Sequence, residues 1–292
     1  MNSTTVPIPT RVMVFGMAHE NGLVLADELF AVAEACGHSV EQVRSCLRRL
    51  VSEGLFMRKG SGREASYVAT EKGLAALGTT MERTRLAYGQ DAAGRGWDGY
   101  WRLVGFAIPE GQRGARDALR DRLIELGGAN IQGGLYVSPH PWHKDAKAAA
   151  ERLGLADRVT MATTEDLDVA GSNDPRELAR TLWPVEDLKH SYGAFLKKFS
   201  PVPALLKEMK SRSERLVDED FLPGALEMAV AFQDCFNRDP LLPPELLPRP
   251  WPGTEARDLV VTSRRLALAM RTTRSRPMLF RFFDEAVEVM PA

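Results

Sequence analysis

The chain has few cysteines and no long apolar run. Its three cysteines, Cys36, Cys46 and Cys235, are an odd number at wide spacing, which fits neither a disulfide framework nor a metal-binding motif. No apolar stretch reaches the roughly 20 residues that a helix needs to cross a bilayer. The opening MNSTTVPIPT lacks the basic start and the apolar stretch of a signal peptide. These absences predict a protein of the reducing cytoplasm without a membrane partner.

Motifs of enzymes are missing as well. The sequence contains no nucleophile elbow, no phosphate-binding Walker loop and no metalloprotease helix. Pro109 and Glu110 follow the first strand expected in the middle of the chain, where a ferredoxin-like nuclease would carry a lone carboxylate. We therefore expect no catalytic residue and no enzyme. A hydrolase or thioesterase that uses an aromatic pocket is the weaker alternative.

Positive charge is concentrated in two places. The formal net charge of −1 gives no overall attraction to nucleic acid. Residues 44–63, however, hold six basic side chains and one acidic side chain, a local charge of +5. A second stretch, 264–281, holds six arginines and no acid, and it suits either a solvated helix face or a contact with phosphate. Its arginines are Arg264, Arg265, Arg271, Arg274, Arg276 and Arg281.

The first third of the chain has the pattern of a DNA-binding domain. Ser39 and Gln42 fit a capping box that starts a helix, and Gly37 and Gly54 suit the ends of the helices that they follow. Helices are expected over 11–19, 25–36, 40–53 and 71–88, and strands over 55–59 and 63–69 around a Gly-Ser-Gly turn. This order predicts a winged helix-turn-helix within residues 1–88.

The helix expected at 40–53 has an apolar and a polar face. The apolar face consists of Val40, Val43, Leu47, Leu50 and Val51. The polar face offers side chains that read base edges in the major groove. These are Gln42, Arg44, Ser45, Arg48 and Arg49. Around the following turn lie Arg58, Lys59 and Arg63, which can follow phosphates or the minor groove. A solvated surface helix would explain the charges of the helix alone, but the basic hairpin beside it favours DNA binding.

The rest of the chain predicts two further domains after a Gly-rich linker at 89–96. Strands are expected over 100–108, 131–138 and 158–163, and helices over 112–126 and 143–153. This β-α-β-α-β run indicates a ferredoxin-like α/β sandwich over 97–170. A helical domain over 171–292 follows, with helices at 176–199, 202–217, 222–237, 254–272 and 278–289 around the six-proline segment 239–253. The expected fold class is α+β.

Candidate ligand-binding residues lie behind the winged helix. His140 and His143 suit a surface loop, although two imidazoles at this spacing can also share a metal ion or contact an effector. Trp101 and Trp142 suit a core, an interface or a pocket for an aromatic ligand. The sequence does not decide between these roles.

Four stretches of the chain resemble the phenylacetate-catabolism repressor family, PaaX. They are VRSCLRRLVSEGLF (43–56), WDGYWRLV (97–104), YGAFLKKFSPVPALLKE (192–208) and DPLLPPELLPRPWPG (239–253), in the family's order. The resemblance implies a winged helix, a central domain akin to the CRISPR adaptation nuclease without its activity, and a C-terminal helical domain. It also implies a homodimer that binds a double-stranded operator and represses catabolic genes.

The resemblance further implies release from DNA by a small molecule. In founding members this effector is an aryl-acetyl-CoA thioester, so we expect an acyl-CoA or related aromatic effector and no resident cofactor. Lys197, Lys198, Arg264 and Arg265 are the cations expected to hold its phosphates. The turn KGSGRE departs from the family's arginine-rich turn with an aromatic after it, a role that falls to Tyr67 here, and the C-terminus is shorter than in some members. Effector, operator and direction of regulation stay open, as does an architectural DNA-binding role without an effector.

Overall fold

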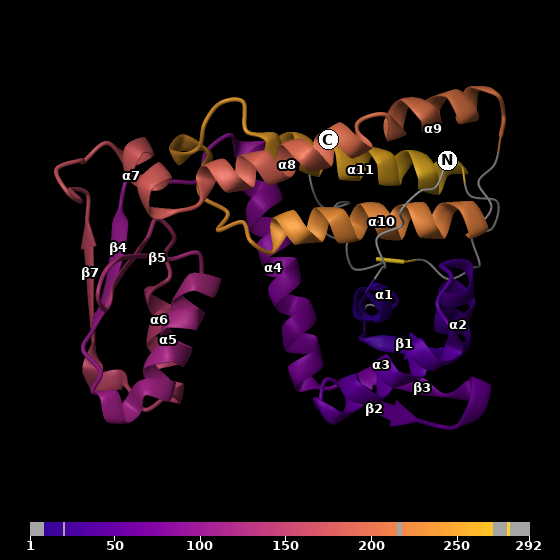
Figure 1. The fold of residues 1–292 in the computed structure, drawn as a ribbon, viewed down its shortest axis with the longest axis horizontal. Coiled ribbons are helices and arrows are strands. Elements are labelled where there is room, and N and C mark those ends of the chain that lie inside the picture. The colour runs from indigo at the N-terminus through magenta and orange to yellow at the C-terminus, as the bar shows by residue number, and fades with distance from the viewer. Residues whose placement is uncertain (1–8, 20, 215–217, 271–278, 281–292) are drawn as a thin grey trace. The chain divides into compact units, whose positions relative to one another are not determined.

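The computed structural model describes residues 9–19, 21–214, 218–270, 279 and 280 (Figure 1). The chain forms two compact units. The first consists of Met1–Gly89, Ala194–Asp234 and Thr254–Ala292, and the second of Gln90–Gly193 and Cys235–Gly253. The expected C-terminal helical region thus contributes to both units, while the three domain boundaries stay predictions. Among the described helices, none has the length and apolar character of a bilayer-crossing segment.

The N-terminal part of the first unit alternates short helices and strands. Its elements are α1 (Thr10–Gly16), β1 (Leu23–Leu25), α2 (Ala26–Ala35), α3 (Val40–Ser52), β2 (Phe56–Lys59) and β3 (Ser66–Ala69). The strands form an antiparallel sheet in the order β1-β3-β2. Two features of this sheet differ from the sequence predictions. Strand β1 was not expected, and the strand predicted to start at residue 63 starts at Ser66, because Gly62–Glu64 form a 3₁₀ turn.

Local hydrogen bonds fix the connection between α2 and α3. Gly37 has a φ of +73°, and the amides of Gly37 and His38 donate to the carbonyls of Glu34 and Ala33, which ends α2 in a Schellman motif. The predicted capping box then starts α3. The Ser39 hydroxyl accepts from the Gln42 amide (3.2 Å), and the Gln42 side chain accepts from the Ser39 amide (2.8 Å). A second Schellman motif, at Gly54, ends α3.

Helix α3 buries a narrower face than its sequence predicts. Val43, Cys46, Leu47 and Leu50 are buried, as their helical spacing requires. Val40 and Val51 were also assigned to this face, but they are 53% and 37% exposed. Both lie at the ends of the helix, where the neighbouring elements no longer cover it. The buried face of the helix therefore extends from Val43 to Leu50.

All three cysteines are free thiols, in keeping with their spacing in the sequence. Burial raises the pKa of Cys36 to about 11 and also raises the pKa of Cys46. Both thiols therefore stay protonated near neutral pH, and Cys46 contributes to the core beneath α3 as a small apolar group.

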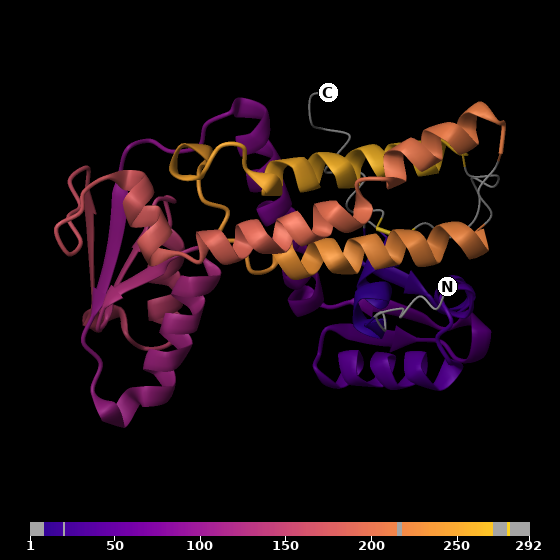
Figure 2. The same ribbon diagram turned by 45° about the horizontal axis from the view of Figure 1, so that its top comes forward.

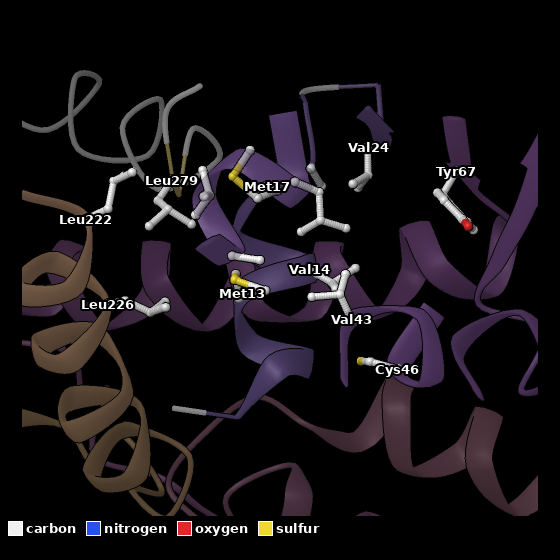
Figure 3. Packing of buried hydrophobic residues seen from close by; sticks show 14 of the residues in the cluster. Met13, Val14, Met17, Val24, Val43, Cys46, Tyr67, Leu222, Leu226 and Leu279 are labelled. Carbon is white, nitrogen blue, oxygen red and sulfur yellow. The ribbon is translucent and has the colours of Figure 1, made fainter. Parts of the chain in front are cut away.

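The core of the first unit joins its N-terminal elements to C-terminal helices. The helices of this unit include α9 (Val202–Ser211) and parts of α4 (Glu71–Ala93), α8 (Val185–Phe199), α10 (Asp218–Phe236) and α11 (Pro252–Met270). One cluster of buried side chains contains Met13 and Met17 of α1 together with Leu222 and Leu226 of α10. Figure 3 shows these side chains beside one another, with Val14 facing Val43 of α3 on the other side of α1. Figures 1 and 2 both show α10 and α11 with nearly parallel axes.

Leu279 and Phe280 dock on α1 in the same unit. Leu279 is fully buried in the cluster. The Phe280 amide donates to the Gly16 carbonyl (2.5 Å), and a Cβ added at Gly16 would lie 2.7 Å from the Phe280 ring. Glycine at position 16 thus makes room for the aromatic ring. The helix predicted over 278–289 otherwise lies outside the described residues.

The second unit contains a four-stranded antiparallel sheet with two helices on one face (Figure 1). Its elements are β4 (Trp101–Phe106), α5 (Arg113–Glu125), β5 (Ala129–Gln132), β6 (Leu135–Ser138), α6 (His143–Arg152) and β7 (Val159–Thr164), and the strand order is β5-β6-β4-β7. The predicted β-α-β-α-β run is thereby corrected to β-α-β-β-α-β, an arrangement found in ferredoxin-like domains.

The correction arises at Gly133 and Gly134. The strand predicted over 131–138 is a hairpin that turns there, with Gly133 at a φ of +50°. A Cβ at Gly134 would lie 2.1 Å from the Phe106 carbonyl oxygen, so only glycine lets the turn approach β4 this closely. The two apolar halves of the hairpin look like one continuous strand when the turn is not recognised.

Several predicted helix bounds also change. Helix α4 continues to Ala93 and so includes part of the expected linker. The helix predicted over 176–199 is two helices, α7 (Pro175–Leu182) and α8, because Trp183 is extended before Pro184, as residues preceding proline prefer. Helix α9 ends at Ser211, and residues 215–217 of its predicted range lie outside the described residues. Short 3₁₀ turns lie at Glu110–Gln112, Ala156–Arg158 and Pro244–Leu246, the last within the proline-rich segment.

Replacing the cap of α3 tests its contribution to stability. We expect Ser39→Ala to lower the free energy of unfolding by about 1 kcal/mol, because the amide of Gln42 loses its acceptor. Urea denaturation followed by circular dichroism measures this. Ser52→Ala, at the other end of the same helix, is the control and should stay within about 0.5 kcal/mol of the unsubstituted protein. Equal effects of both substitutions would contradict the assigned role of the cap.

Candidate nucleic-acid interface

The outer face of α3 presents most of the predicted DNA-contacting side chains to solvent. Arg44, Arg48 and Arg49 are exposed, and Ser45 is half-buried between them. The cap orients the start of the helix, and the buried side chains on the opposite face hold it against α1 and α2. The structure thus brings these four predicted residues together on one side of one rigid helix.

Gln42 is exposed too, but its side chain already takes part in a hydrogen bond that stabilises the helix start. Its carbonyl oxygen accepts from the Ser39 amide in the capping box. Bidentate recognition of adenine needs both the oxygen and the nitrogen of the amide group. Gln42 can therefore donate one hydrogen bond to a base while the cap is intact, whereas reading adenine in full would open the cap.

Two acidic side chains accompany the arginines of α3. Arg48 Nη2 donates to Glu41 Oε1 over 2.8 Å. Glu53, at the end of the helix, accepts from Arg11 of α1 over 2.7 Å. Counting from Glu41 to Glu64, six basic and three acidic residues leave a charge of +3, smaller than the +5 of the narrower window. The surface is therefore positive but not uniformly so.

The β2–β3 hairpin supplies further positive charge. Arg58 and Lys59 are exposed at the end of β2, opposite Tyr67 and Ser66 of β3. The backbone of Arg63 lies in the 3₁₀ turn that follows, while its side chain is not among those described. Tyr67, expected to be the aromatic residue that follows the turn, is 9% exposed and packs in the core. The hairpin thus presents cations and keeps its aromatic side chain inside.

The predicted effector-binding residues are divided between the two units, four in each. In the second unit, three of them donate hydrogen bonds to backbone carbonyls. Trp142 Nε1 donates to the Arg102 carbonyl (3.2 Å), and His143 Nε2 donates to the next carbonyl of β4, that of Leu103 (3.2 Å). His140 Nε2 donates to the Pro240 carbonyl (3.2 Å). The imidazoles therefore bind backbone carbonyls, and within the described residues no three side chains of the metal-ligating kind gather.

Trp101 is buried in an aromatic stack. Its ring lies 5.1 Å from that of Trp97 and 6.2 Å from that of Trp183, whose Nε1 donates to the Gly127 carbonyl (3.0 Å). Of the roles that the sequence left open for Trp101 and Trp142, the structure shows both side chains in a core.

The four predicted cations of the first unit differ in exposure. Lys197 and Arg265 are exposed, and Lys198 pairs with Glu227 of α10 (2.8 Å). Arg264 is half-buried, and its Nη2 donates to the Leu279 carbonyl (2.5 Å). Arg264 thus helps to hold the segment that docks on α1. The remaining arginines of that stretch, Arg271, Arg274, Arg276 and Arg281, lie outside the described residues.

A surface cavity of about 430 Å³ in the second unit was not predicted. It lies between the end of β4, helix α5 and the β5–β6 turn, and its lining includes Phe106 and Tyr136, whose rings stack. Its cations, Arg116 and Arg120, already pair with Glu110 and Asp121, each over 2.9 Å. The cavity has the size of a small-ligand site, but it offers no excess positive charge to a phosphate. No local motif in the sequence marks it, because its residues come from three separate segments.

Three of the family-like stretches meet in the second unit. The Glu245 carboxylate accepts from the amides of Gly96 (3.1 Å) and Trp97 (3.4 Å), which joins the proline-rich segment to the start of the central domain. Asp239, from the same segment, is buried and accepts from the Tyr192 hydroxyl (2.8 Å). These family-like stretches therefore contain residues whose hydrogen bonds stabilise the second unit.

Three models of one protein family match successive parts of the chain. Residues 12–73 match the model described as PaaX-like protein, residues 94–179 the PaaX protein central Cas2-like domain, and residues 183–273 the PaaX-like protein C-terminal domain. Together they cover most of the chain. The chain belongs to the PaaX family, which confirms the resemblance.

The chain is also similar to two individual proteins. The chain is 27% identical over 246 residues to the Transcriptional repressor PaaX of Escherichia coli (strain K12), a match that covers 84% of this chain and 74% of that protein. Its fold is similar to the solved structure of an uncharacterized protein from Mycobacterium tuberculosis, with a TM-score of 0.50 and 25% sequence identity. That match covers 84% of this chain and 87% of the other.

The two neighbouring arginines of α11 allow a matched test of their roles. We expect Arg264→Ala to lower the free energy of unfolding by about 1.5–3 kcal/mol, because a charged hydrogen bond to Leu279 is lost. Arg265→Ala, which removes the same charge from an exposed position, should change it by less than about 0.5 kcal/mol. Urea denaturation of both variants checks this, and an equally small effect of Arg264→Ala would show that the contact adds nothing to stability.

Proposed function

We propose that this protein is a DNA-binding transcription regulator that represses a catabolic operon and leaves its operator when an acyl-CoA effector binds. The observation that carries the proposal is the exposed basic face of α3 next to the basic β2–β3 hairpin, in a chain of the PaaX family. A curated relative with the same family match is a transcriptional repressor. The protein is thus a regulator and not an enzyme.

The order of the N-terminal elements supports a winged helix-turn-helix. Helices α2 and α3 are joined by the four residues from Cys36 to Ser39, and the β2–β3 hairpin follows α3 directly. In this motif the second helix of the pair enters the major groove and its N-terminal residues contact base edges. Helix α3 is accordingly the recognition helix, and the hairpin is the wing.

The exposed cations divide into two roles. Arg44, Arg48 and Arg49 lie on the recognition helix, where arginine pairs with the two acceptors of guanine. Arg58 and Lys59 lie on the wing, where they neutralise phosphates without reading sequence. Such phosphate contacts make affinity fall steeply with salt concentration.

The family suggests a homodimer on a palindromic operator. Two recognition helices then meet half-sites about 34–36 Å apart, one helical turn of DNA. An effector that changes the relative orientation of the two helices spoils this spacing. A coupling of only about 1–3 kcal/mol between effector and DNA changes operator occupancy 5–150-fold. Lys197, Lys198 and Arg265 are the exposed cations among the predicted four, from which a phosphate-binding site for the effector would be built.

Removing positive charge from the recognition helix tests DNA binding. We expect the double substitution Arg48→Ala/Arg49→Ala to abolish the gel shift of operator DNA, because each arginine contributes about 1–3 kcal/mol when it contacts a base. The circular dichroism spectrum should stay unchanged, since both side chains are exposed.

Lys144→Ala/Lys147→Ala provides the matched control. It removes two exposed cations from α6 of the other unit and should leave the gel shift intact. An unchanged gel shift of the arginine double variant would rule out α3 as the recognition helix.

Calorimetric titration tests the effector. We expect acyl-CoA thioesters of aromatic acids to bind and to weaken the operator complex, while the matching free acids bind at least tenfold more weakly because they lack the phosphates. The assay is repeated with the operator present, so that binding and release are measured on one sample. Equal binding by a free acid would overturn the phosphate-binding role of the cations. Operator binding that no thioester or acid weakens would favour an architectural protein without an effector.

A further inference from the structure

The ion pair between Glu41 and Arg48 lies where the recognition helix would meet DNA. Arg48 Nη2 donates to Glu41 Oε1 over 2.8 Å, and the two side chains are 68% and 71% exposed. The partners are seven residues apart on one helix. Seven residues are two turns, so the Cα atoms lie about 10 Å apart along the helix axis and nearly above one another.

The pair occupies the most outward stripe of α3. Successive residues are rotated by about 100°, which places Glu41 opposite Leu50, nine residues later. Leu50 is buried in the core. Glu41 and Arg48 therefore point away from the body of the unit, in the direction from which a DNA groove would be entered.

A carboxylate at this position is unexpected on a surface that binds a polyanion. It lowers the local positive charge and is repelled by phosphates. Its presence is accounted for if it acts on Arg48. The side chain of Arg48 extends toward the helix N-terminus, as side chains on helices do, and Glu41 holds it there. Residues near this end of a recognition helix are the ones that contact bases.

The ion pair leaves Arg48 able to bind a base. A guanidinium has five N–H donors in a planar fork, and the bond to Glu41 uses one of them. The remaining donors of the fork still match the O6 and N7 acceptors of guanine. Without Glu41, a long and exposed arginine samples many rotamers, and phosphates on either side of the groove compete for it.

We propose that Glu41 is a positioning residue that orients Arg48 toward a guanine in the major groove and so sets sequence specificity at one base pair. The proposal rests on the proposed function, and it names the base chemistry that the recognition helix reads. Glu41 contributes specificity at the expense of general attraction to DNA, since its charge opposes phosphate binding.

The test measures base discrimination with the full chain. An operator is first selected from a random pool of duplex DNA, and each of its base pairs is then substituted in turn. Binding constants are compared for the unsubstituted protein, Arg48→Ala, Glu41→Gln and the double variant. Glu53→Gln is the matched control, because it removes the same charge and one exposed ion pair from the same helix, at its other end.

We expect Arg48→Ala to lose discrimination at one G·C pair by roughly 5–150-fold. Glu41→Gln should lose most of the discrimination at that same pair, while its affinity for non-operator DNA rises because a negative charge is gone. The double variant Glu41→Gln/Arg48→Ala should discriminate at this base pair no less than Arg48→Ala alone. Glu53→Gln should leave discrimination intact. If Glu41 served only to stabilise the helix N-terminus, Glu41→Gln would lower thermal stability and leave the discrimination at that base pair unchanged.

Three results would overturn the proposal. The first is unchanged discrimination in Glu41→Gln. The second is a loss at a base pair other than that of Arg48, which would mean that Glu41 reads a base itself, as carboxylates do with the cytosine amine. The third is no loss of discrimination in Arg48→Ala. Failure of the proposed function looks different, because the unsubstituted protein would then select no sequence at all.

Discussion

The packing of α1 is the constraint on which the first unit depends. This helix of seven residues buries Met13, Val14 and Gly16, and Met17 directly after it is buried as well. One side of α1 packs toward α3 through Val14 and Val43, and the other side meets Leu222 and Leu226 of α10 (Figure 3). Because protein interiors are packed as densely as organic crystals, a shift of α10 is felt at α1 and then at α3. Helix α3 is therefore coupled through α1 to the C-terminal helix α10 of the same unit.

The surface of α3 can be specialised because its position is fixed from behind. Val43, Leu47 and Leu50 set its orientation, and the bonds at Ser39 and Gly54 set its ends. None of these contacts involves the outward side chains, apart from Gln42, which serves the cap. The arginines and Glu41 are thus free to vary in chemistry without disturbing the fold, which is the usual relation between a scaffold and its binding face.

Local signals in the sequence predicted the parts of the fold whose hydrogen bonds are local. The cap at Ser39 and the helix ends at Gly37 and Gly54 are set by bonds within a few residues, and all three were predicted correctly. Strand β1 was missed because its three residues form a strand only by pairing with β3, more than forty residues away. The β5–β6 hairpin was missed because its turn depends on the approach of Gly134 to β4. Pairing between distant segments has no local pattern.

The same distinction applies to the candidate sites. The amphipathic pattern of α3 was sufficient to place its arginines outside, because exposure follows from helical periodicity. The residue types of Trp142 and His143 suggested a ligand, but their partners are carbonyls of β4, some forty residues earlier in the chain. Which group an imidazole or an indole binds depends on what the fold brings near it. Residue type therefore predicted that these side chains form hydrogen bonds, but it did not predict the group to which they bind.

The docking of Leu279 and Phe280 on α1 bears on how such a protein can evolve. A DNA-binding domain that is complete in itself can be exchanged between proteins by recombination. Here the apolar surface of α1 is completed by residues almost at the opposite end of the chain. A gene fusion that transferred only the first 88 codons would lack Leu222, Leu226 and Leu279, which belong to the same buried cluster as Met13 and Met17. In this protein, residues from both ends of the described chain form one core, so an exchange of the N-terminal part alone would lose part of that core.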